Sequence, residues 1–107
     1  DLLAATFPGG SITGAPKKRA MEIIRDLEKR FRGAYCGTIG FLSAGGISRW
    51  NIAIRTIEKK GSTVSFAVGA GIVWDSSPQA EYEETLQKAR KILSCLGWSE
   101  ERLQQID

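Results

Sequence analysis

Two glutamates and a lysine after Pro78 have the spacing of a metal and anion site. Glu81, Glu84 and Lys88 stand at positions i, i+3 and i+7, which places them on one stripe of a helix. Mg²⁺ usually takes one or two protein carboxylates and completes its shell with water or ligand oxygens, so this pair could hold it, with Lys88 pairing with an anionic ligand. The alternative is a solvent-side ladder of Glu and Lys, worth ~0.2–0.5 kcal/mol per pair.

A glycine-rich segment stands directly before another predicted helix. Residues 7–17 read FPGGSITGAPK, in which the hydroxyl of Ser11 is available to a ligand and Pro16 suits the first helical position. The free N–H groups of a first helical turn attract anions. The alternative is an ordinary glycine-rich turn before a helix.

Further candidate ligand contacts lie on the predicted strands. The backbone N–H groups of Gly69, Ala70 and Gly71 could form a nest for a carboxylate, although a β-bulge explains the same residues equally well. Arg55 has a planar fork suited to bidentate carboxylate binding, and Tyr35 offers a phenol on a neighbouring predicted strand. Together these residues predict a site for a small anionic molecule, organised by Mg²⁺ and by donors to carboxylates.

The composition restricts the class of protein. The chain has 107 residues, 42% apolar and 25% charged, which is typical of one soluble globular domain at most. The net charge of +3 is spread among acidic residues, so it favours a solvated helix face over a nucleic-acid partner. The absence of histidine excludes Ser-His-Asp and Cys-His nucleophiles within the chain. No apolar run is long enough to cross a membrane, and Cys36 and Cys95 favour a cytoplasmic protein with free thiols.

The apolar pattern predicts an α+β fold. We expect one main helix over residues 16–31 and another from Pro78 to about Gly97. Three β-rich runs, residues 35–43, 47–58 and 63–73, are joined by short glycine-bearing connections, which favours an antiparallel meander of about three strands packed with the two helices. Because the chain begins at Asp1, we expect residues 1–107 to be an incomplete domain.

Five segments in this order resemble the chorismate-binding enzymes. They read FPGGSITGAPKKRAMEII, CGTIGFLS, NIAIRT, GAGIVWDS and EYEETLQKA. The resemblance implies that the chain is the C-terminal portion of a larger, anthranilate-synthase-like chorismate-binding fold. The segment GGSITGAPK is most similar to the para-aminobenzoate (aminodeoxychorismate) synthase component I branch, and the anthranilate synthase branch is next.

The resemblance also implies roles for the candidate residues. Glu84 matches the magnesium ligand of the family, Glu81 the acidic residue near the metal, and Lys88 the active-site lysine near the leaving group. The matched substrate contacts are Ser11, Tyr35, Arg55, Gly69, Ala70 and Gly71.

The implied activity is amination of chorismate to 4-amino-4-deoxychorismate with Mg²⁺, in folate (para-aminobenzoate) biosynthesis. Ammonia would come from a glutamine amidotransferase subunit or domain, and the 107 residues alone would be inactive. One alternative is part of an anthranilate synthase. Another is a non-catalytic module for anion binding or homo-oligomerisation, because an open sheet could be covered by a second copy.

Overall fold

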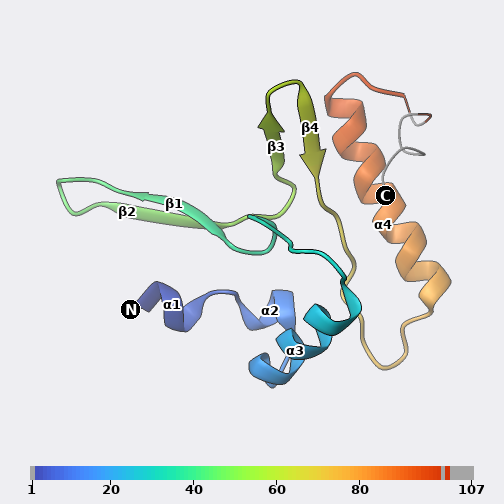
Figure 1. The fold of residues 1–107 in the computed structure, drawn as a ribbon, viewed down its shortest axis with the longest axis horizontal. Coiled ribbons are helices and arrows are strands. Elements are labelled where there is room, and N and C mark those ends of the chain that lie inside the picture. The colour runs from blue at the N-terminus through green and yellow to red at the C-terminus, as the bar shows by residue number, and fades with distance from the viewer. Residues whose placement is uncertain (1, 100, 102–107) are drawn as a thin grey trace. The chain divides into compact units, whose positions relative to one another are not determined.

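The computed structural model describes residues 2–99 and 101 and has an α+β fold, as the sequence predicts. The chain divides into two compact units, Asp1–Thr56 and Ile57–Asp107. Figure 1 shows short helices followed by an antiparallel hairpin in the first unit, and a second hairpin followed by a long helix in the second unit.

The first unit begins with three helices where one was expected. Helix α1 spans Leu2–Thr6, α2 spans Gly10–Thr13 and α3 spans Lys17–Leu27. The glycine-rich segment thus contains a helical turn, in which the Thr13 hydroxyl donates to the Gly9 carbonyl oxygen at 3.0 Å.

The predicted helix over residues 16–31 was too long at both ends. Pro16 is the N-cap of α3, with an extended ψ of 133°, and is not its first helical residue. Glu28 is the C-cap, with a ψ of 100°. Leu27 and Phe31 are exposed, and because helices gain most of their stability from packing, the apolar spacing alone does not extend α3 over these residues.

Strands β1 (Thr38–Leu42) and β2 (Ser48–Ile52) form the first antiparallel hairpin. The turn over residues 44–46 is closed by a hydrogen bond of 2.8 Å from the Ser43 N–H to the Ile47 carbonyl, which confirms the predicted connection. Gly40 faces Trp50 across the pair, and a β-carbon at Gly40 would lie 2.2 Å from the Arg49 carbonyl oxygen.

Strands β3 (Ile57–Lys60) and β4 (Thr63–Phe66) form the second hairpin, with Gly61 at a φ of 60° in the turn. The antiparallel pairing is confirmed, but the predicted middle strand is divided between β2 and β3, so the described residues form two two-stranded sheets instead of one meander. Arg55 has a φ of 51°, in the left-handed region, and an extended strand cannot continue through such a residue.

Helix α4 spans Pro78–Cys95, with Pro78 in its first turn as predicted. It ends in a Schellman motif: the N–H groups of Gly97 and Trp98 donate to the carbonyls of Ser94 and Leu93, and Gly97 has a φ of 67°. These local bonds explain why the helix stops beside Gly97.

The core within the described residues is small. Its buried apolar side chains are Ala89, Ile92 and Leu93 of α4, together with Cys36 and Ala53 in the first unit. On α4, Tyr82 is exposed although it is a large aromatic residue. Both cysteines are free. Among the described residues, no helix has the length and apolar character to cross a membrane.

Candidate functional site

Lys88 connects α4 with the glycine segment after β4. Its ammonium group donates a hydrogen bond to the Gly69 carbonyl oxygen at 2.9 Å and pairs with a Glu84 carboxylate oxygen at 2.5 Å. The Lys88 side chain is 31% exposed and that of Glu84 is 50% exposed. Three of the residues selected from the sequence are therefore joined in one cluster, in which the lysine is fixed and the carboxylate faces solvent.

Glu81 is held one turn before this cluster. One of its carboxylate oxygens accepts a hydrogen bond of 2.7 Å from the Ser76 hydroxyl, whose oxygen in turn accepts a bond of 3.0 Å from the Val73 N–H. Glu81 and Glu84 share a face of α4 through their i, i+3 spacing. Sequence reasoning did not find the role of Ser76 in orienting Glu81.

Glu81 and Glu84 are the two acidic side chains selected from the sequence on this face of α4. Within residues 2–99 and 101, no group of three or more Cys, Asp or Glu side chains is placed to hold a metal ion. A divalent cation on Glu81 and Glu84 would need its other ligands from water, substrate or further chain, which is the usual arrangement for Mg²⁺.

The predicted backbone donors lie in an irregular segment. Strand β4 ends at Phe66, whereas the sequence predicted a strand over residues 63–73; residues 67–73 are irregular. Gly69 and Ala70 are half-buried, and a β-carbon at Gly71 would meet nothing within 4 Å. The segment leaves open space beside Gly71, while the Gly69 carbonyl is already used by Lys88.

Tyr35 lies in a turn over residues 33–37, before β1, and not within a strand as expected. The Arg32 guanidinium lies 5.7 Å from the centre of its ring. Arg32 also donates two hydrogen bonds, of 2.7 and 2.5 Å, to the two carboxylate oxygens of Glu28. Burial, followed by the neighbouring Cys36, raises the pKa of Tyr35 to about 12, so the phenol stays protonated at neutral pH.

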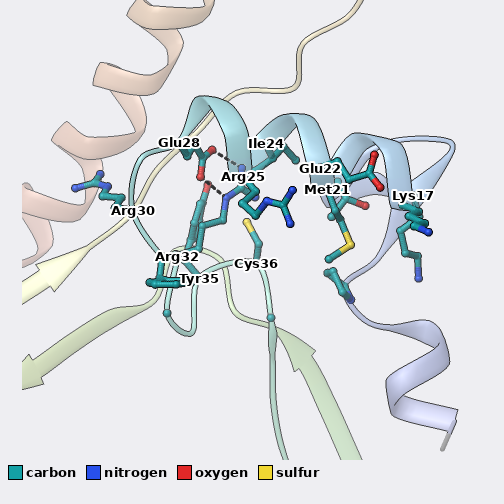
Figure 2. Close-up of a pocket in the computed structure, with 16 residues that line it drawn as sticks. Lys17, Met21, Glu22, Ile24, Arg25, Glu28, Arg30, Arg32, Tyr35 and Cys36 are labelled. Atoms are coloured by element: carbon teal, nitrogen blue, oxygen red, sulfur yellow. Dashed lines mark hydrogen bonds and ion pairs between the residues drawn. The ribbon is translucent and has the colours of Figure 1, made fainter.

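These residues line a pocket of about 830 Å³ in the first unit, which sequence reasoning missed. Figure 2 shows Glu28, Arg32, Tyr35 and Cys36 gathered at one part of the pocket, with Lys17 at the other end of α3. The side chains of α3 and the turn form its walls. The i, i+4 spacing of Glu28 and Arg32 is the sequence signal that could have located the pocket. The two residues bond to each other although both lie after the last residue of α3.

Ser11 and Arg55 do not line this pocket. Ser11 is exposed on α2, and Arg55 is exposed at the break between β2 and β3. The sequence predicted Arg55 within a continuous strand over residues 47–58. The left-handed backbone at Arg55 makes that placement wrong.

A family model described as "chorismate binding enzyme" matches residues 1–94. The chain belongs to this family. It is 53% identical to aminodeoxychorismate synthase component 1 of Escherichia coli (strain K12) over 96 residues, which cover 90% of the chain and 21% of that protein. The family resemblance inferred from the five segments is thereby confirmed.

Anthranilate synthases are the next group of relatives. The chain is 48% identical to anthranilate synthase component 1 1 of Haloarcula marismortui over 96 residues, 90% of the chain and 20% of that protein. It is 46% identical to anthranilate synthase component 1 of Aquifex aeolicus (strain VF5) over 101 residues, 94% of the chain and 20% of that protein. The chain therefore spans about a fifth of the length of these family members.

Proposed function

We propose that these residues form part of a site that aminates chorismate to 4-amino-4-deoxychorismate in folate biosynthesis, with ammonia supplied by a glutamine amidotransferase in the cytoplasm. The similarity to aminodeoxychorismate synthase component 1 supports the reaction. The observation that carries the proposal is the cluster of Glu84, Lys88 and Gly69, because it joins a carboxylate, a cation and a glycine segment by direct contacts.

Glu84 and Glu81 are the proposed magnesium ligands. Mg²⁺ bound there would supply Lewis-acid assistance to the departing hydroxyl of the substrate. The fit rests on the two carboxylates on adjacent turns of α4, of which Glu81 is oriented by Ser76. Lys88, fixed between Glu84 and the Gly69 carbonyl, would hold positive charge close to the leaving oxygen.

The carboxylates of chorismate are the proposed ligands of the remaining residues. Tyr35 can donate a hydrogen bond because its phenol stays protonated, and Arg55 can donate two in parallel. The N–H groups of Gly69, Ala70 and Gly71 would bind carboxylate oxygen, and the Ser11 hydroxyl would face the substrate; in the described structure, Ser11 is exposed. Because these groups are hydrogen-bond donors, their main contribution to catalysis would be to hold the rigid chorismate dianion in a fixed position.

Anthranilate formation is the second candidate, because anthranilate synthases match the same residues at 46–48% identity. The two reactions differ in their products. An amine that retains the enolpyruvyl group indicates the first function, whereas release of pyruvate with an aromatic amine indicates the second.

The test uses the full-length polypeptide in which these residues occur, with chorismate, ammonium and Mg²⁺, and separates the products by chromatography. We expect Glu84→Gln to lower turnover by about 100-fold or more, because it removes a charged metal ligand. Glu83→Gln is the matched control, since Glu83 is exposed on the same helix and accepts a hydrogen bond of 2.8 Å from the Gln79 side chain, away from the cluster of Glu84, Lys88 and Gly69. Full turnover in Glu84→Gln would overturn the assigned role.

A further inference from the structure

The contact between Glu28 and Arg32 beside Tyr35 has no role in the chemistry assigned above. We propose that Glu28 and Arg32 are positioning residues, which hold the Tyr35 phenol where it donates to a substrate carboxylate. This inference rests on the proposed function, because it concerns the same candidate carboxylate contact.

The geometry fixes the guanidinium in two directions. Its Nε and Nη2 atoms donate to the two oxygens of Glu28 at 2.7 and 2.5 Å, so the plane of the fork is set by the carboxylate. Its Cζ atom lies 5.7 Å from the centre of the Tyr35 ring, a distance at which a cation is attracted to an aromatic face. The Arg32 side chain is 26% exposed and that of Glu28 is 41% exposed, so the guanidinium is partly shielded from solvent while the carboxylate reaches it.

The backbone shows why such a tie is needed. Helix α3 ends at Leu27, with Glu28 as its C-cap, and Arg32 lies beyond it, so the ion pair spans non-helical chain. The Arg32 carbonyl accepts a hydrogen bond of 3.1 Å from the Tyr35 N–H, while the Cys36 N–H donates to the Ala53 carbonyl at 2.9 Å. Tyr35 is therefore held between the end of α3, through Arg32, and the residue after β2.

Electrostatics gives Glu28 a separate part in this arrangement. Burial and the neighbouring Cys36 are the main causes of the raised pKa of Tyr35; the smaller effects of Arg32, which lowers this pKa, and of Glu28, which raises it, oppose each other. Arg32, in turn, lowers the pKa of Glu28 through its side-chain hydrogen bond, which keeps the carboxylate charged. The Arg32 guanidinium therefore contacts the Tyr35 ring as a cation, and the negative charge of Glu28 partly cancels the effect by which Arg32 would favour the phenolate.

Helix α3 also offers a matched control. Arg19 and Glu22 form an ion pair with a single contact of 3.2 Å, and their side chains are 67% and 37% exposed. This pair is also formed by arginine and glutamate, but it lacks the bidentate geometry and the ring contact.

The experiment measures steady-state kinetics with chorismate in the full-length polypeptide in which these residues occur. We expect Arg32→Gln and Glu28→Gln each to raise the KM for chorismate about tenfold, with kcat changed less than about twofold, because a ground-state contact is loosened. Arg32→Lys should raise the KM less than Arg32→Gln does, since lysine keeps the positive charge but lacks the two parallel donors of the guanidinium. Arg19→Gln should behave as wild type.

A double substitution separates positioning from general destabilisation. In a Tyr35→Phe background, Arg32→Gln should raise the KM by less than about twofold further, because the group on which it acts is gone. An unreduced tenfold effect in that background would overturn the inference.

A second measurement does not depend on the proposed function. With ¹³C-labelled tyrosine, and the Tyr35 signal assigned through Tyr35→Phe, Arg32→Gln should shift and narrow that NMR signal and leave the Tyr82 signal unchanged. If the wild type does not turn over chorismate, the proposed function fails, and the NMR result still decides whether the pair holds the ring. An unchanged Tyr35 signal would refute the pair's effect on the ring.

Discussion

Ser76→Ala is expected to loosen the start of α4 far more than Ser77→Ala. Ser77 is the N-cap residue, the position at which a serine hydroxyl usually caps a helix, yet its side chain makes no capping hydrogen bond. The Ser76 hydroxyl instead accepts from the Val73 N–H at 3.0 Å and donates to Glu81 at 2.7 Å. Alanine at position 76 removes both bonds.

The magnitude follows from the two partners. A neutral hydrogen bond contributes ~1 kcal/mol and one to a charged group ~1.5–3 kcal/mol. Ser76 is half-buried, so water replaces part of this loss, and we expect a net cost of about 1–2 kcal/mol. That cost corresponds to an opening equilibrium about 5–30 times more favourable. Ser77→Ala keeps the backbone bond of 3.0 Å from the Glu81 N–H to the carbonyl of residue 77 and should be nearly neutral.

Amide hydrogen exchange of Glu81 is the direct assay, because its N–H donates to the carbonyl of residue 77 at the start of α4 and keeps that acceptor in both variants. Ser76→Ala should accelerate exchange at this amide by the factor given above. The same variant should weaken Mg²⁺ activation by about tenfold, because a group that orients a proposed metal-site carboxylate is lost. Equal acceleration by Ser77→Ala, or none by Ser76→Ala, would refute the reasoning.

Two other predictions concern the first unit. Gly40→Ala should destabilise the hairpin of β1 and β2 by about 1–3 kcal/mol, because the added carbon would lie 2.2 Å from a backbone oxygen. The control is Gly45→Ala, whose added carbon would meet only the Ser43 hydroxyl at 3.9 Å. If both variants lose the same free energy of unfolding in urea, the steric argument is contradicted. The folded state lowers the pKa of Glu28, mainly through the hydrogen bond from Arg32. The ionised Glu28 carboxylate therefore stabilises the folded state above the ordinary pKa of 4.5, and this contribution is lost as pH falls through the lowered pKa. Glu28→Gln should therefore reduce the loss of stability in acid unfolding curves, and an unchanged curve would contradict this assignment.

Local sequence rules were sufficient where the controlling contacts are local. Pro78 begins α4, Gly97 closes its Schellman motif and Gly61 occupies a turn with positive φ, because each requirement is set within a few residues. The i, i+3, i+7 spacing likewise predicted that Glu81, Glu84 and Lys88 share one face of α4. The five family segments were recognised from residue types alone, and the family match over residues 1–94 confirms them.

Tertiary structure decided contacts that residue spacing did not predict. Spacing could not show that Lys88 reaches the Gly69 carbonyl, 19 residues earlier, or that Arg32 bonds Glu28 beyond the end of α3 and stacks on Tyr35. The predicted strand over residues 47–58 is wrong at Arg55, because a left-handed backbone divides it there. The sequence by itself therefore determined which residue types are present and which share a helical face, whereas the path of the backbone between elements determined which of them touch.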